Sequence, residues 1–363
     1  MSWSNYDHQN KLSRLSHPRL NRKDMTLASP FISQIREKWE IGLPQGFNIG
    51  LPQDIPIMLA VGGGKGGVGK SIVSANVAGV LGNMGVRVLL IDLDVGSANL
   101  HTYFGLSVPQ NTLARYLFAG QCDFSESIIQ TPVEGVSLIA GGKDETWSDQ
   151  AEINTNLFVQ LWSEITQCKT RDLFDVVIFD LGAGNNKYAL DFFSSAHLGI
   201  VTVLPEPTSI ENAYSFLKST MGRLLDNVGI NTGECVIAEQ IKELLFSYNS
   251  EESKNSYREK LNQLYEKFPQ FIDVFHSSLV SRKIGFVVNQ IRSQKDIEIG
   301  QSMKIIAQNY FGFNTCYLGH LNYDDAAWKA LRNRKLLLTD FPHSILVRRI
   351  GEVAHNILSS LGY

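Results

Sequence analysis

The sequence predicts an α/β fold: a mostly parallel, twisted β-sheet with helices on both faces, plus a helical insertion. Short apolar runs rich in Val, Ile and Leu are typical of strands that are buried on both faces. Stretches with helical periodicity lie between and after these runs, and such alternation favours parallel strands whose carboxyl ends form a ligand-binding edge. The predicted strands are residues 57–63, 87–94, 136–142, 175–182, 198–206, 283–290 and 315–321, and the predicted helices are 69–83, 151–167, 208–224, 295–310 and 342–360.

Two segments depart from this alternation. Residues 1–56 are polar, contain five prolines and repeat the tetrapeptide GLPQ, so we interpret them as an N-terminal arm or linker that is partly disordered. Residues 57–363 then form one domain. Within it, residues 234–280 carry charges and apolar residues at helical spacing with little strand signal, which predicts an insertion of two or three helices.

The bulk composition excludes several classes of protein. The chain has 363 residues, 44% of them hydrophobic, and a formal net charge of −3, so the whole molecule is not a polyanion binder. Its four cysteines are far apart and form no CxxC pair, which argues against a zinc ribbon or a thioredoxin-like motif. No apolar run approaches the ~20 residues of a membrane span, and the N-terminus has no signal-peptide pattern. We therefore expect a cytoplasmic protein without an integral membrane segment.

The strongest chemical signal is the stretch GKGGVGKS, which fits the pattern G-x-x-x-x-G-K-[ST] of a phosphate-binding loop. It follows a predicted strand and precedes a predicted helix, as such a loop requires. Lys70 is expected to reach the β- and γ-phosphates, and the Ser71 hydroxyl to ligate Mg²⁺. The backbone that wraps the phosphates is then that of Gly64, Gly66, Gly67, Val68, Gly69, Lys70 and Ser71.

Carboxylates follow two further predicted strands. Asp92 and Asp94 end the second apolar run, and Asp180 follows four apolar residues of the fourth. One aspartate at a strand end is more often a turn residue or a helix cap. Three of them together with the loop predict a site for Mg²⁺ and a nucleoside triphosphate. Gly182 and Gly184 would let the turn after Asp180 approach the γ-phosphate and sense its presence.

These motifs resemble those of the MinD/ParA ATPases. A lysine directly after the first loop glycine, as in GKGGVGKS, resembles their deviant Walker A loop. IDLDVGSANLH resembles their switch I, and FDVVIFDLGAG their Walker B and switch II. LPEPTSIENAYSFLK and YLGHLNYDDAAWKALRNRKLLL resemble segments of the flagellar-number regulator branch (FlhG/FleN-like). The resemblance runs from about Ile57 to the C-terminus apart from the insertion, and the N-terminus lacks a clear match to the DQAxxLR element of that branch.

The resemblance implies a P-loop NTPase fold and a role for each matching residue. Lys65 would reach across a homodimer to the partner's phosphates, so that ATP lies at the interface between two subunits. Asn289 would hydrogen-bond adenine, for which an amide offers both donor and acceptor. The remaining implied roles are orientation of the attacking water by Asp94, support of the magnesium shell by Asp92, water-mediated Mg²⁺ binding by Asp180, and a border to the base from the turn at Pro205 and Pro207.

The function that the resemblance implies is an ATP-dependent dimerising switch with slow intrinsic hydrolysis to ADP and phosphate. It would control the number or placement of a cellular structure, preferably flagella, and respond to a protein partner such as a flagellar GTPase. A chromosome or plasmid partition ATPase or a division-site positioning ATPase is the alternative within the superfamily. A non-hydrolysing, nucleotide-dependent interaction scaffold is the alternative of another class.

Two surfaces would connect such a switch to its target. The first surface is a cluster of four Lys and Arg residues on or after a predicted helix. Such a cluster can bind DNA phosphates non-specifically, although it is more often only a solvated helix end. The predicted C-terminal helix has apolar residues at helical spacing, which favours a packed core helix over a peripheral membrane anchor at the inner membrane face or a cell pole. The cations are Lys329, Arg332, Arg334 and Lys335, and the apolar residues are Leu346, Ile350, Val353, Ile357 and Leu361.

Overall fold

The computed structural model describes residues 55–94, 98–120, 122–142, 157–167, 173–246 and 264–362. The predicted arm at 1–56 lies outside the described residues except for Ile55 and Pro56. Residues 151–156 of the predicted helix at 151–167 and residues 247–263 of the predicted insertion also lie outside them.

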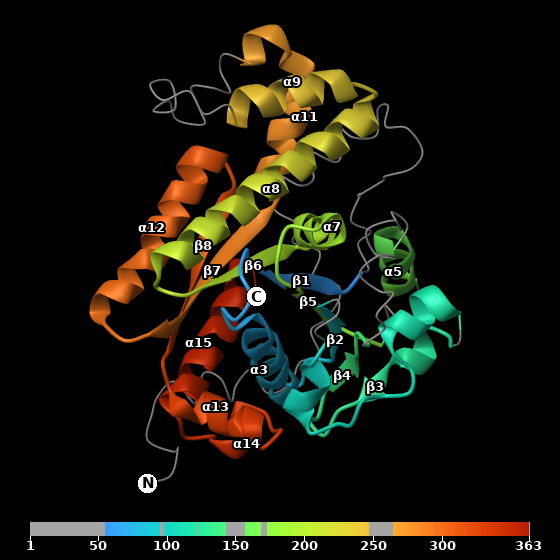
Figure 1. Cartoon of the computed structure of the whole chain (residues 1–363), viewed down its shortest axis with the longest axis vertical. Coiled ribbons are helices and arrows are strands. Elements are labelled where there is room, and N and C mark those ends of the chain that lie inside the picture. The colour runs from blue at the N-terminus through green and yellow to red at the C-terminus, as the bar shows by residue number, and fades with distance from the viewer. Residues whose placement is uncertain are drawn as a thin grey trace.

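An eight-stranded sheet forms the centre of the domain, in the order β3-β4-β2-β5-β1-β6-β7-β8 (Figure 1). All neighbouring strands are parallel except the β3–β4 pair. The seven predicted strands are confirmed; the two-residue β3 was missed because so short a strand has no periodicity. The strands are β1 Ile57–Gly62, β2 Val88–Leu93, β3 Ile129–Gln130, β4 Val136–Ile139, β5 Val176–Leu181, β6 Leu198–Val203, β7 Lys283–Ile291 and β8 Asn314–Asn322.

Helices cover both faces of the sheet, and the strand side chains divide between them. In β5, Val177 and Phe179 belong to one buried apolar cluster, whereas Val176 and Ile178 belong to the other. This alternation explains why the strands read as continuous apolar runs. One cluster packs against α5 (Leu157–Thr166), α7 (Lys187–Ser195), α8 (Pro207–Thr232), α11 (Pro269–Val280) and α12 (Gln294–Phe311), and the other against α3 (Lys70–Asn83), α13 (Asp325–Arg332), α14 (Leu337–Asp340) and α15 (Ile345–Ser360).

The stretch predicted as a helical insertion is helical where the structure describes it. It contains α9 (Cys235–Phe246) and α11, and both pack against α8. Ala238 and Ile241 of α9 and Phe275 of α11 are buried in the same apolar cluster as α8. At 26 residues, α8 is longer than the predicted helix, so it extends from the ligand-binding edge of the sheet out to the insertion.

The C-terminal helix α15 is a packed core helix, as predicted. Leu346, Ile350, Val353 and Ile357 are buried on the sheet side of this helix. Its apolar face is therefore not available to a membrane. Across the part of the chain that the structure describes, no helix combines the length and hydropathy that a membrane crossing requires.

Candidate functional site

The predicted phosphate loop joins β1 to α3 at the carboxyl edge of the sheet. Gly67 and Gly69 have φ values of 79° and 94°, in the left-handed region that glycine adopts without strain. Gly69 is the N-cap of α3, so no side chain caps the helix there, and Lys70 to Val73 contain no acidic residue. The N–H groups and the positive end of the helix dipole are thus left for an external anion.

Gly64 lies in direct contact with helix α8. A Cβ atom added at Gly64 would lie 2.0 Å from the carbonyl oxygen of Asn212, whereas one added at Gly66 would lie 3.8 Å from Ala183, its nearest neighbour. The absence of a side chain at 64 therefore lets the loop rest on α8. This contact between residues 148 positions apart has no signature in the local sequence pattern.

The contact leads to a stability prediction. Gly64→Ala is expected to lower the free energy of unfolding by about 3 kcal/mol, because the methyl group overlaps backbone that must move. Gly66→Ala is the matched control and is expected to change it by less than about 0.5 kcal/mol. Urea unfolding of the two variants and the wild type measures both values. Equal stability of the two variants would contradict the close approach of the loop to α8.

Lys70 is a buried cation inside the loop. Its residue surface is 6% exposed, and its ammonium group lies 3.4 Å from the carbonyl oxygen of Lys65. Burial lowers the pKa of Lys70, while the charges of Asp180 and Asp94 raise it. A cation in this position is stabilised when an anion enters the loop, so the geometry suits a phosphate ligand.

Asp92 and Asp180 are register neighbours on β2 and β5, and both are fully buried. Burial first, and then the charge of Asp180, raise the pKa of Asp92 to about 8. The two carboxylate oxygens of Asp92 accept the backbone N–H groups of Asp94 and Leu100, each at 3.1 Å. The Asp92 carboxylate therefore holds the backbone at Asp94 and at Leu100. The predicted support of the magnesium shell by Asp92 stays a prediction.

Asp180 faces the first turns of α3. Its carboxylate accepts the Ser74 hydroxyl at 2.8 Å, and side-chain hydrogen bonds from Ser71 and Ser74 lower its pKa. Burial outweighs these bonds and raises the pKa of Asp180 to about 6. Ser74 was not predicted as part of the site; its position one turn after Ser71, on the same helix face, is the signal that could have found it.

The raised pKa values predict a pH dependence. In the unfolded chain the Asp180 carboxyl group loses its proton near pH 4, whereas in the folded chain it keeps that proton up to about pH 6. In this window the folded state binds more protons, so this group makes the free energy of unfolding fall as pH rises. Compared with the wild type, Asp180→Asn is therefore expected to gain free energy of unfolding as pH rises from 4 to 6, by up to about 1.4 kcal/mol per pH unit.

The measurement is urea unfolding without Mg²⁺ at a series of pH values. Asp273→Asn, at an exposed carboxylate on α11, is the control and is expected to differ from the wild type by a constant amount. A gain for Asp180→Asn that does not grow with pH would contradict the burial of a carboxylate at this position.

The loops after β2 and β5 approach each other at Asp94. A Cβ added at Gly182 would lie 2.8 Å from Oδ1 of Asp94, so only glycine allows this proximity. Burial raises the pKa of Asp94, and the charge of Lys70 lowers it. Gly184 has a φ of 99°, and among the described residues no atom lies within 4 Å of a Cβ built there. The turn that carries Gly184 thus borders open space, as a ligand-sensing turn requires.

Asn289 contacts the phosphate loop directly. Its Nδ2 donates to the carbonyl oxygen of Val68 at 2.9 Å, and its Oδ1 accepts the N–H of Gln290 at 2.9 Å. A Cβ at Gly69 would clash with the same amide group. The contact with adenine stays a prediction; the amide retains a second N–H and a second lone pair for it. Pro205 lies between β6 and α8, at the same edge of the sheet.

Lys65 points out of its own loop toward the start of α8. Its ammonium group lies 3.5 Å from the Thr208 hydroxyl and 4.0 Å from Oε2 of Glu206, and its side chain is 42% exposed. These contacts are long and exposed, so they hold the side chain weakly. The structure therefore places one loop lysine inside the phosphate site and the other at the surface beside it.

These residues fit a bound Mg²⁺–nucleotide. The uncapped N-terminus of α3 and the buried Lys70 suit the phosphates, and the Ser71 hydroxyl and Asp180 are the oxygen donors that a hard cation prefers. Within the described ranges, no group of three or more His, Cys, Asp or Glu side chains could hold a metal ion by itself. A magnesium ion here would depend on the phosphates for much of its coordination.

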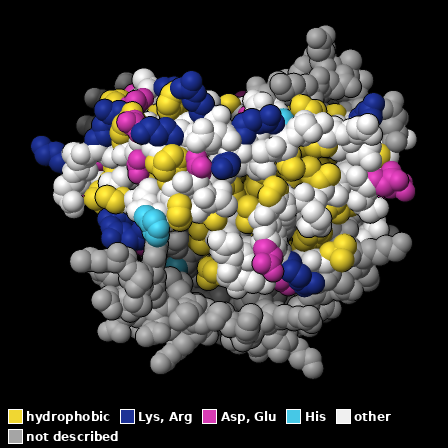
Figure 2. Space-filling model, turned by 90° about the horizontal axis from the view of Figure 1, so that it is seen from below, with side chains coloured by type: hydrophobic (Ala, Val, Ile, Leu, Met, Phe, Trp, Pro, Cys, Tyr) yellow, Lys and Arg dark blue, Asp and Glu magenta, His cyan; other side chains and the backbone are white. Residues whose placement is uncertain are grey.

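The four predicted surface cations are all exposed, on α13 and the turn after it. Arg332 lies over the ring of Trp328 at 5.2 Å, and Trp328 is itself 60% exposed. Lys335 lies 3.7 Å from Asp340. Figure 2 views the molecule from the side on which α13 and α14 lie, and Lys and Arg side chains gather on one part of that face with hydrophobic side chains between them.

The fold and the phosphate-binding loop together define the class of this chain, which is a P-loop nucleotide-binding protein. A family model described as the CobQ/CobB/MinD/ParA nucleotide binding domain matches residues 59–337. The chain belongs to that family, so the predicted P-loop fold and the resemblance to MinD and ParA are confirmed.

The relatives are similar over part of their length. The chain is 35% identical over 162 residues to the antiactivator FleN of Pseudomonas aeruginosa, covering 44% of this chain and 55% of FleN. It is 29% identical over 170 residues to the flagellum site-determining protein YlxH of Helicobacter pylori, covering 44% of this chain and 52% of YlxH. The chain thus matches about half the length of these two relatives.

A solved structure shows the same fold. Septum site-determining protein MinD from Pyrococcus horikoshii, complexed with Mg-ADP, has a TM-score of 0.57 and 20% identity, covering 85% of this chain and 98% of that one. At this identity the likeness establishes the fold alone.

Proposed function

We propose that this protein is an ATP-dependent molecular switch that dimerises around ATP and hydrolyses it to ADP and phosphate. The observation that carries the proposal is that the two loop lysines lie in different environments. Lys70 is buried beside Asp180 and Asp94, whereas the Lys65 side chain is 42% exposed and is held weakly beside the start of α8. The partial exposure of Lys65 next to the phosphate site supports the proposal that it reaches the phosphates of a second subunit.

Each residue then has a role that its position supports. The N-terminus of α3 and Lys70 bind the phosphates, and Ser71 and Asp180 would hold Mg²⁺, which supplies charge neutralisation on the phosphates when it is bound. Asp94 orients the attacking water from the loop after β2. Lys65 of the second subunit stabilises the charge that develops during phosphoryl transfer. Turnover is slow until a partner stimulates it.

The process that we propose for the switch is control of the number or placement of a cellular structure, with flagella preferred. The likeness to FleN and YlxH supports this choice. The partner would be a protein such as a flagellar GTPase. We place the protein in the cytoplasm, with a peripheral position at the inner membrane face or a cell pole as the finer proposal.

One experiment separates the candidate functions. Phosphate release is measured with the protein alone and with duplex DNA, anionic liposomes or a candidate flagellar GTPase. Stimulation by the GTPase supports the flagellar proposal. Stimulation by DNA alone would overturn it in favour of a partition ATPase, for which the exposed cations of α13 are the candidate surface. No hydrolysis under any condition would favour the non-hydrolysing scaffold.

A further inference from the structure

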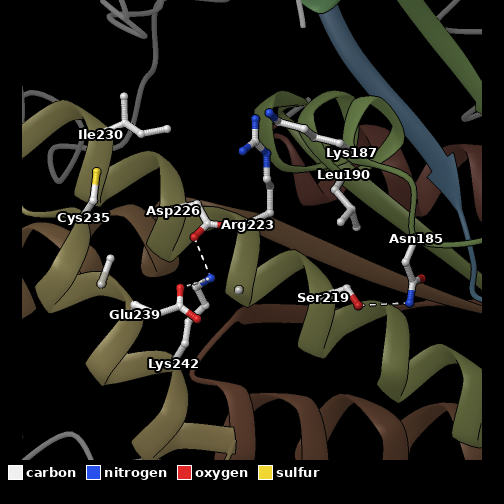
Figure 3. Close-up of a pocket in the computed structure, with 12 residues that line it drawn as sticks. Asn185, Lys187, Leu190, Ser219, Arg223, Asp226, Ile230, Cys235, Glu239 and Lys242 are labelled. Atoms are coloured by element: carbon white, nitrogen blue, oxygen red, sulfur yellow. Dashed lines mark hydrogen bonds and ion pairs between the residues drawn. The ribbon is translucent and has the colours of Figure 1, made fainter. Parts of the chain in front are cut away.

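The turn after β5 is attached to helix α8 by one side-chain hydrogen bond. Nδ2 of Asn185 donates to the hydroxyl of Ser219 at 3.0 Å (Figure 3). Asn185 directly follows Gly184. The next residue, Asn186, is the N-cap of α7 and accepts the N–H of Ala189 at 2.9 Å. The backbone carbonyl of Asn186 also accepts the N–H of Leu190 at 3.1 Å, so Asn186 is fixed to α7, whereas Asn185 is joined to α8 by its side chain.

Packing does little to hold Asn185 in place. The residue is exposed, and with Ser219 it forms one end of a groove of about 610 Å³ between α7, α8 and α9. Among the interactions of the described residues, the hydrogen bond to Ser219 is the one that the Asn185 side chain makes, and open space borders Gly184 beside it.

The same face of α8 also contacts the phosphate loop. Thr208, Asn212 and Ser219 are spaced by four and seven residues, which places them on one face of a helix. Thr208 lies beside the ammonium group of Lys65, and the backbone of Asn212 lies against Gly64. One rigid helix face therefore sets the position of the loop at one end and of the turn at the other.

We propose that Ser219 is a positioning residue that, through Asn185, fixes the turn carrying Gly182 and Gly184 relative to the phosphate loop. The proposal rests on the proposed function, in which this turn faces the γ-phosphate. Loss of the bond leaves the phosphate loop intact, so nucleotide affinity is retained. The turn no longer keeps a fixed position relative to the γ-phosphate, so the hydrolytic step slows.

The test compares variants at both ends of the bond. Ser219→Ala and Asn185→Ala each remove it, and Ser219→Thr keeps the hydroxyl. Ser215→Ala, at an exposed serine one turn earlier on the same face, is the matched control. The net contribution of one neutral hydrogen bond corresponds to about a fivefold change in a rate or an equilibrium constant. Ser219→Ala and Asn185→Ala are therefore each expected to lower kcat about fivefold, with KM within about twofold of the wild-type value. The double variant is expected to match the single ones, and Ser219→Thr and Ser215→Ala to match the wild type.

Hydrogen–deuterium exchange of the peptide covering residues 182–186 provides a readout that needs no hydrolysis. Exchange is expected to be about fivefold faster in Ser219→Ala and Asn185→Ala and unchanged in Ser215→Ala. Unchanged exchange would overturn the positioning role, as would additive effects of the two alanines on kcat or equal shifts in KM and kcat. If the wild type hydrolyses no ATP, the proposed function fails, whereas the exchange measurement still decides the role of Ser219.

Discussion

Replacing Lys70 by alanine is expected to raise the Kd for ADP by about 100-fold or more. The ammonium group of Lys70 is buried in the loop, and no described carboxylate forms an ion pair with it within 4 Å. A bound phosphate would be its counter-ion, and removing one partner of a buried charge pair costs 2–5 kcal/mol or more. Titration with a fluorescent ADP derivative in the presence of Mg²⁺ measures this change.

The same variant is expected to fold normally. Burial already disfavours the charged form of Lys70, so its loss leaves the free energy of unfolding unchanged or higher in the absence of nucleotide. Lys187→Ala, at an exposed lysine that begins α7, is the control for the loss of one positive charge. Binding of ADP by Lys70→Ala within about threefold of the wild type would contradict the placement of Lys70 at the phosphates.

Replacing Lys65 by alanine is expected to lower the hydrolysis rate about 100-fold while the Kd for ADP stays within about twofold. In one subunit Lys65 lies outside the phosphate site, so binding by that subunit does not need it. In the proposed dimer it stabilises developing charge, and one such group is typically worth a factor of 10² to 10³. Phosphate release at saturating ATP measures the rate, with Lys218→Ala on α8 as the control. Unchanged hydrolysis would contradict a catalytic role for Lys65.

The sheet and the phosphate loop could be predicted because their signals are local. Continuous apolar runs such as residues 175–182 report burial on both faces of a strand, and the structure divides those residues between two cores. The spacing of the loop glycines and Lys70 reports backbone that wraps an anion. The helix α7 was missed because it has only nine residues and begins shortly after a glycine-rich turn.

The contacts that join distant segments could not be predicted, because periodicity reports burial and does not identify the partner. The closeness of Gly64 to Asn212 depends on where α8 lies. The bond from one N–H of the Asn289 amide to the carbonyl oxygen of Val68 likewise depends on where β7 lies relative to the loop. The type and position of Asp92 predict support of a magnesium shell, which stays a prediction, but they gave no sign that its carboxylate accepts the backbone N–H groups of Asp94 and Leu100. A strand-end aspartate has the same sequence signature in either role.

Sedimentation velocity of the protein with Mg²⁺ shows whether ATP joins two copies of this chain through Lys65. The wild type and Lys65→Ala are each measured with ADP, with ATP and without nucleotide. We expect the wild type to be a monomer without nucleotide and with ADP and a dimer with ATP, and we expect Lys65→Ala to be a monomer under all three conditions. A wild type that stays monomeric with ATP, or a Lys65→Ala variant that dimerises with ATP as the wild type does, would contradict this expectation.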